Sequence, residues 1–524
     1  MTFTIRGATV LDGTGEAPFI ANVVVGSGRI RKVGEEVEGE IIDADGLYLA
    51  PGFIDCHCHD DLAALREPDR PEKVAQGITT VVVGNCGFSL FPCEESSREA
   101  VRAHAAGLLG GVGSDEVFRS FAEYRAALEA GGMAINVIPL VGHGPIRLME
   151  LGYDASPASD KSLARMKHEL GRQLGQGAAG LSLGLVYPPS AFADRRELVE
   201  LCRCAAERDK PVAAHIRGYE AMLPDATAEF LDLLQESGAR GILSHLQAAG
   251  RPNWGLVAKA LEAMDEARAA GVDVVCDMYP YVAGSSYALQ LLPPTELAGG
   301  VDGLKKRLRG KGYREILRAR LLDPVKDESG WQSKISLIGW ESILIAGTGA
   351  AALKEFEGKT LAEIGQHSDP FDILVRLLLE DDGATAIILF QLSEDDLRTV
   401  FESPLAMVGS DGIPRFEGRP HPRGFGAFPR IWDRLAREKG WLTPATAVAR
   451  MTSRAASVFG LKDRGVIRPG AGADMILFEP EFCDRATFES PRSLATGMRD
   501  VWVAGTPVMR DGSGTGARPG AAMV

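Results

Sequence analysis

The chain has 524 residues, of which 45% are hydrophobic and 24% are charged, and its formal net charge is −14 at pH 7. A chain of this length is too long for one small hydrophobic core, so it predicts one large domain and a smaller second domain. The negative charge would repel a phosphate backbone, and the Lys/Arg-rich stretch at residues 305–320 has no nucleic-acid motif around it. We therefore expect no nucleic-acid partner.

The N-terminal segment MTFTIRGATVLDGTG has neither a basic start nor an apolar core. No later stretch reaches the roughly 20 apolar residues of a membrane-spanning helix, so we expect no membrane partner. Isolated cysteines such as Cys202, Cys204 and Cys276 do not form the pattern of a disulfide framework. These features predict a reducing, cytoplasmic location with thiols free to bind metal. The sequence leaves the oligomeric state open, and a homo-oligomer is one of the expected partners.

Both ends of the chain carry short alternating strands that are broken by turns. Residues 1–50 contain three such segments, and a matching pattern returns at residues 473–480 and 499–512. The pattern predicts a small β-sandwich that is built from both chain ends, residues 1–50 and residues 465–524.

Between these ends, continuous apolar runs alternate with helical segments. The runs lie at residues 79–85, 134–143, 178–184, 211–216, 241–247 and 272–279. Such a pattern is typical of a parallel sheet that is covered on both faces, and it predicts an α/β fold, a (β/α)8 TIM-type barrel, over residues 51–464. A stretch rich in charge and helix formers predicts an inserted lid lobe at residues 287–375.

Five side chains at the predicted strand ends are candidate metal ligands. His57 and His59 follow an apolar run at a spacing that points both side chains the same way in a strand, although two ordinary polar residues would also suit this place. Cys86, His215 and His245 each end a further apolar run, and each alone would suit a core position. Together they offer the nitrogen and sulfur ligands that zinc prefers, and the Cys86 thiolate could bridge two ions.

Asp411 lies in the segment AMVGSDGIP, where an apolar run delivers a carboxylate into a glycine-rich loop. An Asp before Gly is also a common turn pair. As a catalytic residue, it would take a proton from the attacking water and pass it to the leaving nitrogen, while zinc polarises the carbonyl oxygen. The residues thus predict a zinc-dependent hydrolase of an amide-type bond. A hydrolase with Cys86 as nucleophile would leave the histidines unexplained.

The motifs that carry these residues resemble the amidohydrolase superfamily, and within it the N-acyl-D-amino-acid deacylases (D-aminoacylases). The resemblance spans nearly the whole chain, and its carriers include PGFIDCHCHDD, GNCGFSLFP, AAHIRGYE, SHLQAAGRPNWG and VGSDGIP. The Asn-Cys-Gly segment at residues 85–87 is the most discriminating, because most relatives bridge their metals with a carboxylated lysine, whereas D-aminoacylases use this cysteine.

The resemblance implies roles for the candidate residues. It implies one tightly bound Zn²⁺ held by Cys86, His215 and His245, and it leaves open a second, weaker site. That second site would use His57 and His59 together with Cys86. Asp411 would be the catalytic acid and base.

The resemblance also implies substrate-binding residues. Tyr187 would help to polarise the scissile carbonyl, and Tyr279, Ser285 and Arg423 would lie near the substrate carboxylate; their residue types alone would also suit packing, a turn or a surface ion pair. Gln247 stands where the family usually has a lysine, so a cation that would pair with the carboxylate is missing. A neutral amide can bond a carboxylate, but a bond to a charged donor is roughly twice as strong.

The resemblance implies a small-molecule amide substrate, with deacylation of N-acyl-D-amino acids to a carboxylate and a free amino acid. Gln247 keeps open an amidase that acts on a dipeptide, a lactam or a carboxylate-free acyl amide. A non-catalytic protein with the same fold is a remote alternative, which the presence of all five ligand candidates and Asp411 disfavours. The sequence leaves the acyl chain and the amine open.

Overall fold

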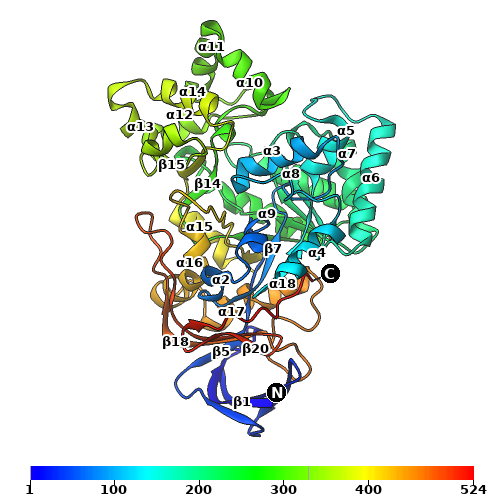
Figure 1. The fold of residues 1–524 in the computed structure, drawn as a ribbon, viewed down its shortest axis with the longest axis vertical. Helices are drawn as coiled ribbons and strands as arrows, with labels where there is room; N and C mark the ends of the chain where they lie inside the picture. Colours follow the sequence, from blue (N-terminus) through cyan, green and yellow to red (C-terminus); the bar gives the residue numbers. More distant parts are fainter. Residues whose placement is uncertain (1, 328–329, 524) are drawn as a thin grey trace.

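The computed structural model describes residues 2–327 and 330–523. A barrel occupies the middle of the molecule, a β-sheet lies at one end, and a mainly helical lobe lies at the opposite end (Figure 1). None of the helices in the described ranges is long and apolar enough to cross a membrane.

The barrel has eight strand positions, all parallel, in two hydrogen-bonded groups. The strands are β6 (Phe53–Asp55), β7 (Ile78–Val83), β8 (Asn136–Pro139), β9 (Val141–Gly142), β10 (Leu181–Gly184), β11 (Val212–His215), β12 (Gly241–Leu243), β13 (Val274–Met278) and β17 (Ala406–Val408). Only Leu140 separates β8 from β9, so these two share one position. A parallel bridge between Cys58 and Gly412 joins the segments after β6 and β17 and closes the ring.

Every residue of these barrel strands is buried, as their continuous apolar sequences predict. The expected (β/α)8 class is therefore confirmed. The helices around the barrel are α1 (Ala63–Arg66), α2 (Pro71–Val74), α3 (Arg98–Leu109), α4 (Phe121–Gly131), α5 (His143–Leu151), α6 (Asp160–Gly175), α7 (Arg195–Ala206), α8 (Leu223–Ser237), α9 (Leu256–Ala269), α15 (Glu394–Glu402), α16 (Arg423–Arg430), α17 (Pro444–Met451) and α18 (Ser453–Val458).

Helix α7 illustrates how the sequence determines where these helices begin and which face they bury. The Asp194 side chain accepts a hydrogen bond from Glu197 N and caps the first turn. The buried residues Leu198, Leu201 and Cys202 recur at helical spacing and form one apolar face toward the barrel.

Strands from both chain ends form one nine-stranded sheet around its own buried core. The strands are β1 (Thr2–Val10), β2 (Phe19–Gly26), β3 (Arg29–Gly34), β4 (Glu40–Asp43), β5 (Tyr48–Pro51), β18 (Met475–Cys483), β19 (Thr496–Val503), β20 (Thr506–Arg510) and β21 (Ser513–Gly514). The two ends meet where β5 pairs antiparallel with β18, with Leu49 opposite Leu477. The division of the chain at residues 50 and 465 stays a prediction.

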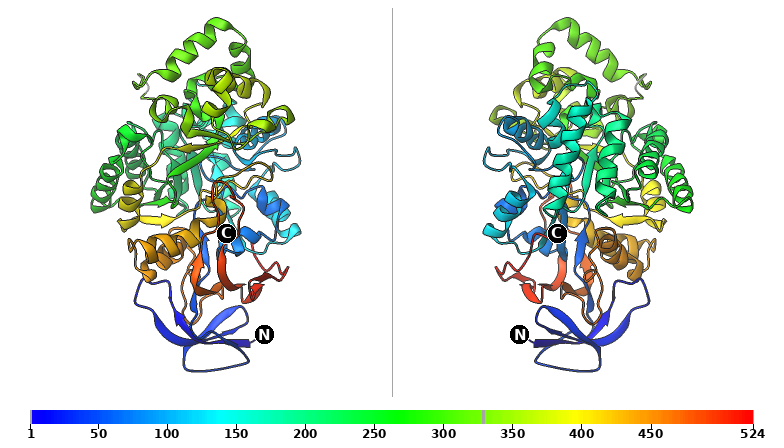
Figure 2. Two further views of the ribbon diagram at one scale, coloured as in Figure 1. Left: turned by 90° about the vertical axis from the view of Figure 1, so that its left-hand side faces the viewer. Right: turned by 90° about the vertical axis from the view of Figure 1, so that its right-hand side faces the viewer.

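The lobe is inserted between β13 and β17 and lies at the end of the barrel opposite to the nine-stranded sheet (Figure 2). Its antiparallel sheet has the order β14 (Ala283–Tyr287), β16 (Ala386–Phe390) and β15 (Ile343–Gly347). Its helices are α10 (Gly300–Leu308), α11 (Lys311–Leu322), α12 (Lys334–Ile338), α13 (Leu361–Ile364) and α14 (Pro370–Glu380). Because β14 pairs with β16, this sheet extends beyond both limits of the expected range 287–375.

Candidate metal centre and active site

The structure brings the six predicted metal and catalytic residues together at the carboxyl ends of the barrel strands. This is the face at which TIM barrels carry their active sites. All six are buried, and each lies at the end of a strand or just after it: His57 and His59 after β6, Cys86 after β7, His215 at the end of β11, His245 after β12, and Asp411 after β17.

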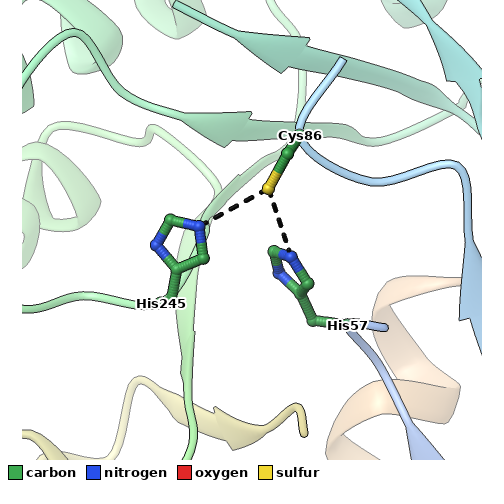
Figure 3. Close-up of side chains that lie close together, drawn as sticks. All are labelled: His57, Cys86 and His245. Carbon is green, nitrogen blue, oxygen red and sulfur yellow. Dashed lines mark hydrogen bonds between the residues drawn. The ribbon is translucent and has the colours of Figure 1, made fainter. Parts of the chain in front are cut away.

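Cys86 lies at the centre of one group of donor atoms. Its Sγ atom is 3.4 Å from His57 Nε2 and 3.5 Å from His245 Nε2 (Figure 3). The ring centroid of His215 lies 4.5 Å from that of His245. Neither ring nitrogen of His215 has a hydrogen-bond partner within the described residues, although the side chain is buried. A buried imidazole without partners is costly, and a bound metal ion would satisfy it.

A second group of donor atoms adjoins the first and shares His57. His59 Nε2 is 3.2 Å from Asp411 Oδ1, and His57 Nε2 is 3.6 Å from the same oxygen. In each group, His57–Cys86–His245 and His57–His59–Asp411, the donor atoms lie within 4.8 Å of one another. The two groups offer thiolate, imidazole and carboxylate ligands, which fit zinc.

The charges and the burial around Cys86 and His215 favour the ligand forms of these two side chains. Burial by itself raises the pKa of the Cys86 thiol, but the charge of His57 and the neighbouring imidazoles of His215 and His245 hold it well below its ordinary value. The thiolate is the form that binds metal. Burial, together with the charge of His245, lowers the pKa of His215 to about 4, so this imidazole is neutral near pH 7.

Three of these residues have a left-handed backbone, which non-glycine residues rarely adopt. The φ angles are +55° at Cys86, +37° at His245 and +47° at Asp411. Such conformations cost about 1–3 kcal/mol each and cluster at functional sites. Here the Asp411 N–H donates to the His57 carbonyl at 2.7 Å, which fixes the turn that carries the carboxylate.

Asp277, within β13, orients two of the candidate ligands, and the sequence reasoning missed it. Its Oδ2 atom lies 3.1 Å from His57 Nδ1, and its Oδ1 atom accepts a hydrogen bond of 2.8 Å from the His245 N–H. A carboxylate behind a ligand histidine fixes the ring and its tautomer. A lone aspartate inside the apolar strand VVCDM was the signal that could have found it.

Four of the five expected substrate-binding residues, Tyr187, Gln247, Tyr279 and Ser285, line one pocket. His59, Cys86, His215, His245 and Asp411 line the same pocket. The Tyr279 hydroxyl donates to Gln247 Oε1 at 3.0 Å. The sequence reasoning missed the remaining lining residues: Leu108, Gly284, Ser286, Gln290, Leu389, Gln391 and Ile413.

Arg423, the fifth expected residue, lies behind this wall and is not among the lining residues. Its Nη1 atom is 2.9 Å from Asp411 Oδ2, and its guanidinium carbon stacks 4.4 Å from the centroid of the Tyr279 ring. Burial would raise the pKa of the Asp411 carboxyl, but the Arg423 charge and the hydrogen bond from His59 hold it well below its ordinary value. Asp411 is therefore ionised near neutral pH.

A buried thiolate–imidazole cluster beside an ionised carboxylate, at the mouth of a (β/α)8 barrel, defines the class of metal-dependent hydrolases. The sequence comparison agrees with that class, because the model of the amidohydrolase family matches residues 40–183 and 371–509. The chain belongs to the amidohydrolase family, in the branch of the N-acyl-D-amino-acid deacylases. The expected enzyme class, a hydrolase of carbon–nitrogen bonds other than peptide bonds, is thereby confirmed.

Similar curated proteins span nearly the whole chain. The N-acyl-D-glutamate deacylase of Alcaligenes xylosoxydans xylosoxydans is 35% identical over 512 residues, which is 97% of this chain and 93% of that protein. The D-aminoacylase of the same organism is 33% identical over 522 residues, covering 98% and 96% of the two chains.

Solved structures agree with this family assignment. The N-acyl-D-glutamate deacylase of Bordetella bronchiseptica, solved with zinc and a phosphonate inhibitor, superposes with a TM-score of 0.84 at 34% identity and covers 99% of both chains. A D-aminoacylase with a binuclear metal centre gives a TM-score of 0.83 at 30% identity, covering 99% of this chain and 98% of that one.

Proposed function

We propose that this chain is a zinc-dependent deacylase that hydrolyses N-acyl-D-amino acids to a carboxylate and a free amino acid. The observation that carries the proposal is the Cys86 thiolate between His57 and His245, with Asp411 beside them. The relatives that align with nearly the whole chain include an N-acyl-D-glutamate deacylase and a D-aminoacylase.

The proposed division of the ligands follows the family resemblance, because the structure itself groups Cys86 with His57 and His245. Cys86, His215 and His245 would hold the tightly bound Zn²⁺, and His57 and His59 with Cys86 would form a weaker second site. When bound, zinc supplies a Lewis acid that polarises the carbonyl oxygen and increases the acidity of water.

Proton transfer falls to Asp411. Its carboxylate is kept ionised by Arg423, so it can accept a proton from the attacking water. The water oxygen bonds to the acyl carbon, the acyl C–N bond breaks, and Asp411 returns the proton to the leaving nitrogen. Tyr187 lines the same pocket and would orient the scissile carbonyl.

The inserted lobe is proposed to set the preference for the acyl group. A second, largely apolar pocket adjoins the active site through Gln290, which lines both. Barrel residues Phe192 and Met222 and lobe residues Leu292 and Trp331 contribute to its wall. Exchange of residues 287–375 for those of a relative should change the order of acyl chain preference, and an unchanged order would contradict this role.

A reducing location, the cytoplasm, fits the thiols of this chain. All eight cysteines are free in the described structure, and seven of them are buried. A disulfide-dependent protein would not keep them unpaired.

The first test is a substrate panel with the zinc-loaded protein. The panel contains N-acyl-D-amino acids, N-acyl-L-amino acids, anilides, dipeptides and lactams, with Asp411→Asn as the control for contaminating activity. Hydrolysis of D-amino-acid derivatives that is lost in the variant supports the proposal. Hydrolysis of lactams or dipeptides alone would reassign the substrate.

A further inference from the structure

The pocket beside the metal ligands has a wall without fixed positive charge. Among the described residues that line it there is no lysine or arginine. Three glutamine side chains line it instead, with Gln247 from the barrel and Gln290 and Gln391 from the lobe side. The wall therefore presents neutral carboxamides to whatever binds there.

The guanidinium behind the wall is already engaged. Arg423 is fully buried, pairs with Asp411 at 2.9 Å, and donates from Nη2 to the Ser285 carbonyl at 3.3 Å. A substrate carboxylate in this pocket would lose its hydration without gaining a cationic side chain from the wall, and such burial is unfavourable.

One buried acceptor of the wall lacks a partner. Gln391 Oε1 has no hydrogen-bond partner within the described part of the chain, and its side chain is only 6% exposed. The Gln391 Oε1 atom can only accept a hydrogen bond, so it requires an N–H or O–H from the ligand. A carboxylate offers none, whereas a carboxamide offers two.

Gln247 complements this acceptor. Its Oε1 atom already accepts from the Tyr279 hydroxyl, and the described residues provide no acceptor for its Nε2 group. That group can donate to the oxygen of a bound carboxamide. Donor and acceptor together match a neutral amide on the ligand.

We propose that this pocket selects acylated D-amino acids whose α-carboxyl group is blocked as a neutral carboxamide. The inference rests on the proposed deacylase function and names the form of its substrate. Water adds its oxygen to the acyl carbon, the acyl C–N bond breaks, and the released amine takes the proton, while the α-carboxamide stays intact. The product of this preferred substrate is a D-amino-acid amide, whereas the free acids of the proposed function give a free amino acid.

The decisive experiment compares matched pairs that differ only in this group. The zinc-loaded enzyme is assayed with N-acetyl-D-leucine against N-acetyl-D-leucinamide, and with the corresponding D-phenylalanine and D-alanine pairs. We expect kcat/KM to be at least about 10-fold higher for the amides, because only their carboxamide group can donate a hydrogen bond to Gln391 Oε1. Calorimetry with the Asp411→Asn variant measures binding of both forms without turnover.

Two substitutions move this preference in opposite directions. Gln247→Lys supplies a cation and should lower the amide-to-acid ratio of kcat/KM by about 10-fold. Gln391→Glu places a negative charge in the wall, so it should raise the ratio by excluding the acid. Gln235→Lys makes the same change at an exposed position of α8 and serves as the matched control with an unchanged ratio. Zinc content and circular dichroism check that each variant is folded.

The outcomes separate the two proposals. Hydrolysis and binding of the free acids in preference to the amides would overturn the neutral-substrate inference and leave the deacylase function standing. A ratio unaffected by both Gln247→Lys and Gln391→Glu would overturn it as well. No hydrolysis of either form, in these pairs or in the D-amino-acid panel, would overturn both.

Discussion

The backbone conformation of Cys86 and the charges around its thiol both favour metal binding. Its positive φ angle turns the side chain at the end of β7, where His57 and His245 both lie within 3.5 Å of the sulfur. The same neighbours lower the pKa of its thiol. The residue is thus held at an energetic cost in the conformation and protonation state that bind a metal ion.

Replacement of Cys86 by alanine should abolish tight zinc binding. The variant loses the thiolate that contacts both histidines, so we expect less than one zinc ion per chain after dialysis and no measurable hydrolysis. Elemental analysis gives the zinc content, and circular dichroism checks the fold. Cys202→Ala, at a buried position of α7 outside the site, is the matched control. Full zinc content in Cys86→Ala would contradict the assigned ligand set.

Replacement of Asp411 by asparagine should leave zinc in place and remove proton transfer. General acid–base catalysis contributes about 10²–10⁴-fold, so kcat should fall by that factor. Steady-state kinetics and zinc content are measured on the same sample. A variant with normal zinc content and a kcat within a few-fold of the parent would exclude Asp411 as the proton carrier.

At the scale of elements, a buried ionic cluster joins two barrel helices. His143 Nε2, at the start of α5, lies 2.7 Å from Glu197 Oε1 of α7, and Arg147 of α5 forms an ion pair with the same carboxylate. Burial opposes ionisation of Glu197, but the hydrogen bond and charge of His143 and the charge of Arg147 outweigh it and lower the pKa. The helices that frame the barrel are therefore coupled by charge as well as by apolar packing.

Glu197→Gln should destabilise the fold in a pH-dependent way. Because the folded-state pKa lies below the ordinary value of 4.5, the ionised carboxylate stabilises the fold above that pH, and this stability is lost as the pH falls through the folded pKa. Breaking one partner of a buried pair costs about 3–5 kcal/mol. We expect that loss at pH 7 and a smaller one near pH 4, measured by urea unfolding. Glu207→Gln, exposed at the end of α7, should change little at either pH. An equal loss at both pH values would argue against the charge as the cause.

On the scale of the whole molecule, residues 519–523 pass beside the barrel wall. The Gly520 N–H donates to the Met133 carbonyl at 2.8 Å, and the Val137 N–H donates to the Ala521 carbonyl at 3.0 Å. The tail thereby pairs with backbone groups of β8 and the segment before it. The C-terminal segment belongs to the barrel as well as to the nine-stranded sheet.

Deletion of residues 519–524 should lower the midpoint of thermal unfolding. The deletion leaves buried backbone groups of β8 without partners, at about 1–3 kcal/mol for each group. Differential scanning calorimetry measures the midpoint, and kcat/KM at 25 °C should be unchanged because the tail lies away from the carboxyl ends of the strands. Arg518→Ala removes an exposed ion pair with Asp69 and a hydrogen bond to the Gly131 carbonyl but leaves the backbone pairing intact, so it should shift the midpoint much less. An equal shift in both proteins would contradict a structural role of the backbone pairing.

The sequence by itself determined the barrel strands, the joining of the two chain ends and the six residues that meet at the strand ends. Apolar runs and the polar residues that follow them can be recognised locally in the sequence. A strand buried on both faces is apolar along its length, and the active residues of a TIM barrel follow the carboxyl ends of such strands. Only the tertiary structure decided that Arg423 pairs with Asp411, that Asp277 supports His57 and His245, and that Ser286 and Gln391 complete the pocket. The places of Ser286 and Gln391 depend on how the lobe strands β14 and β16 pair. The other contacts join distant barrel segments, and hydrophobic periodicity records burial without recording which distant side chains meet.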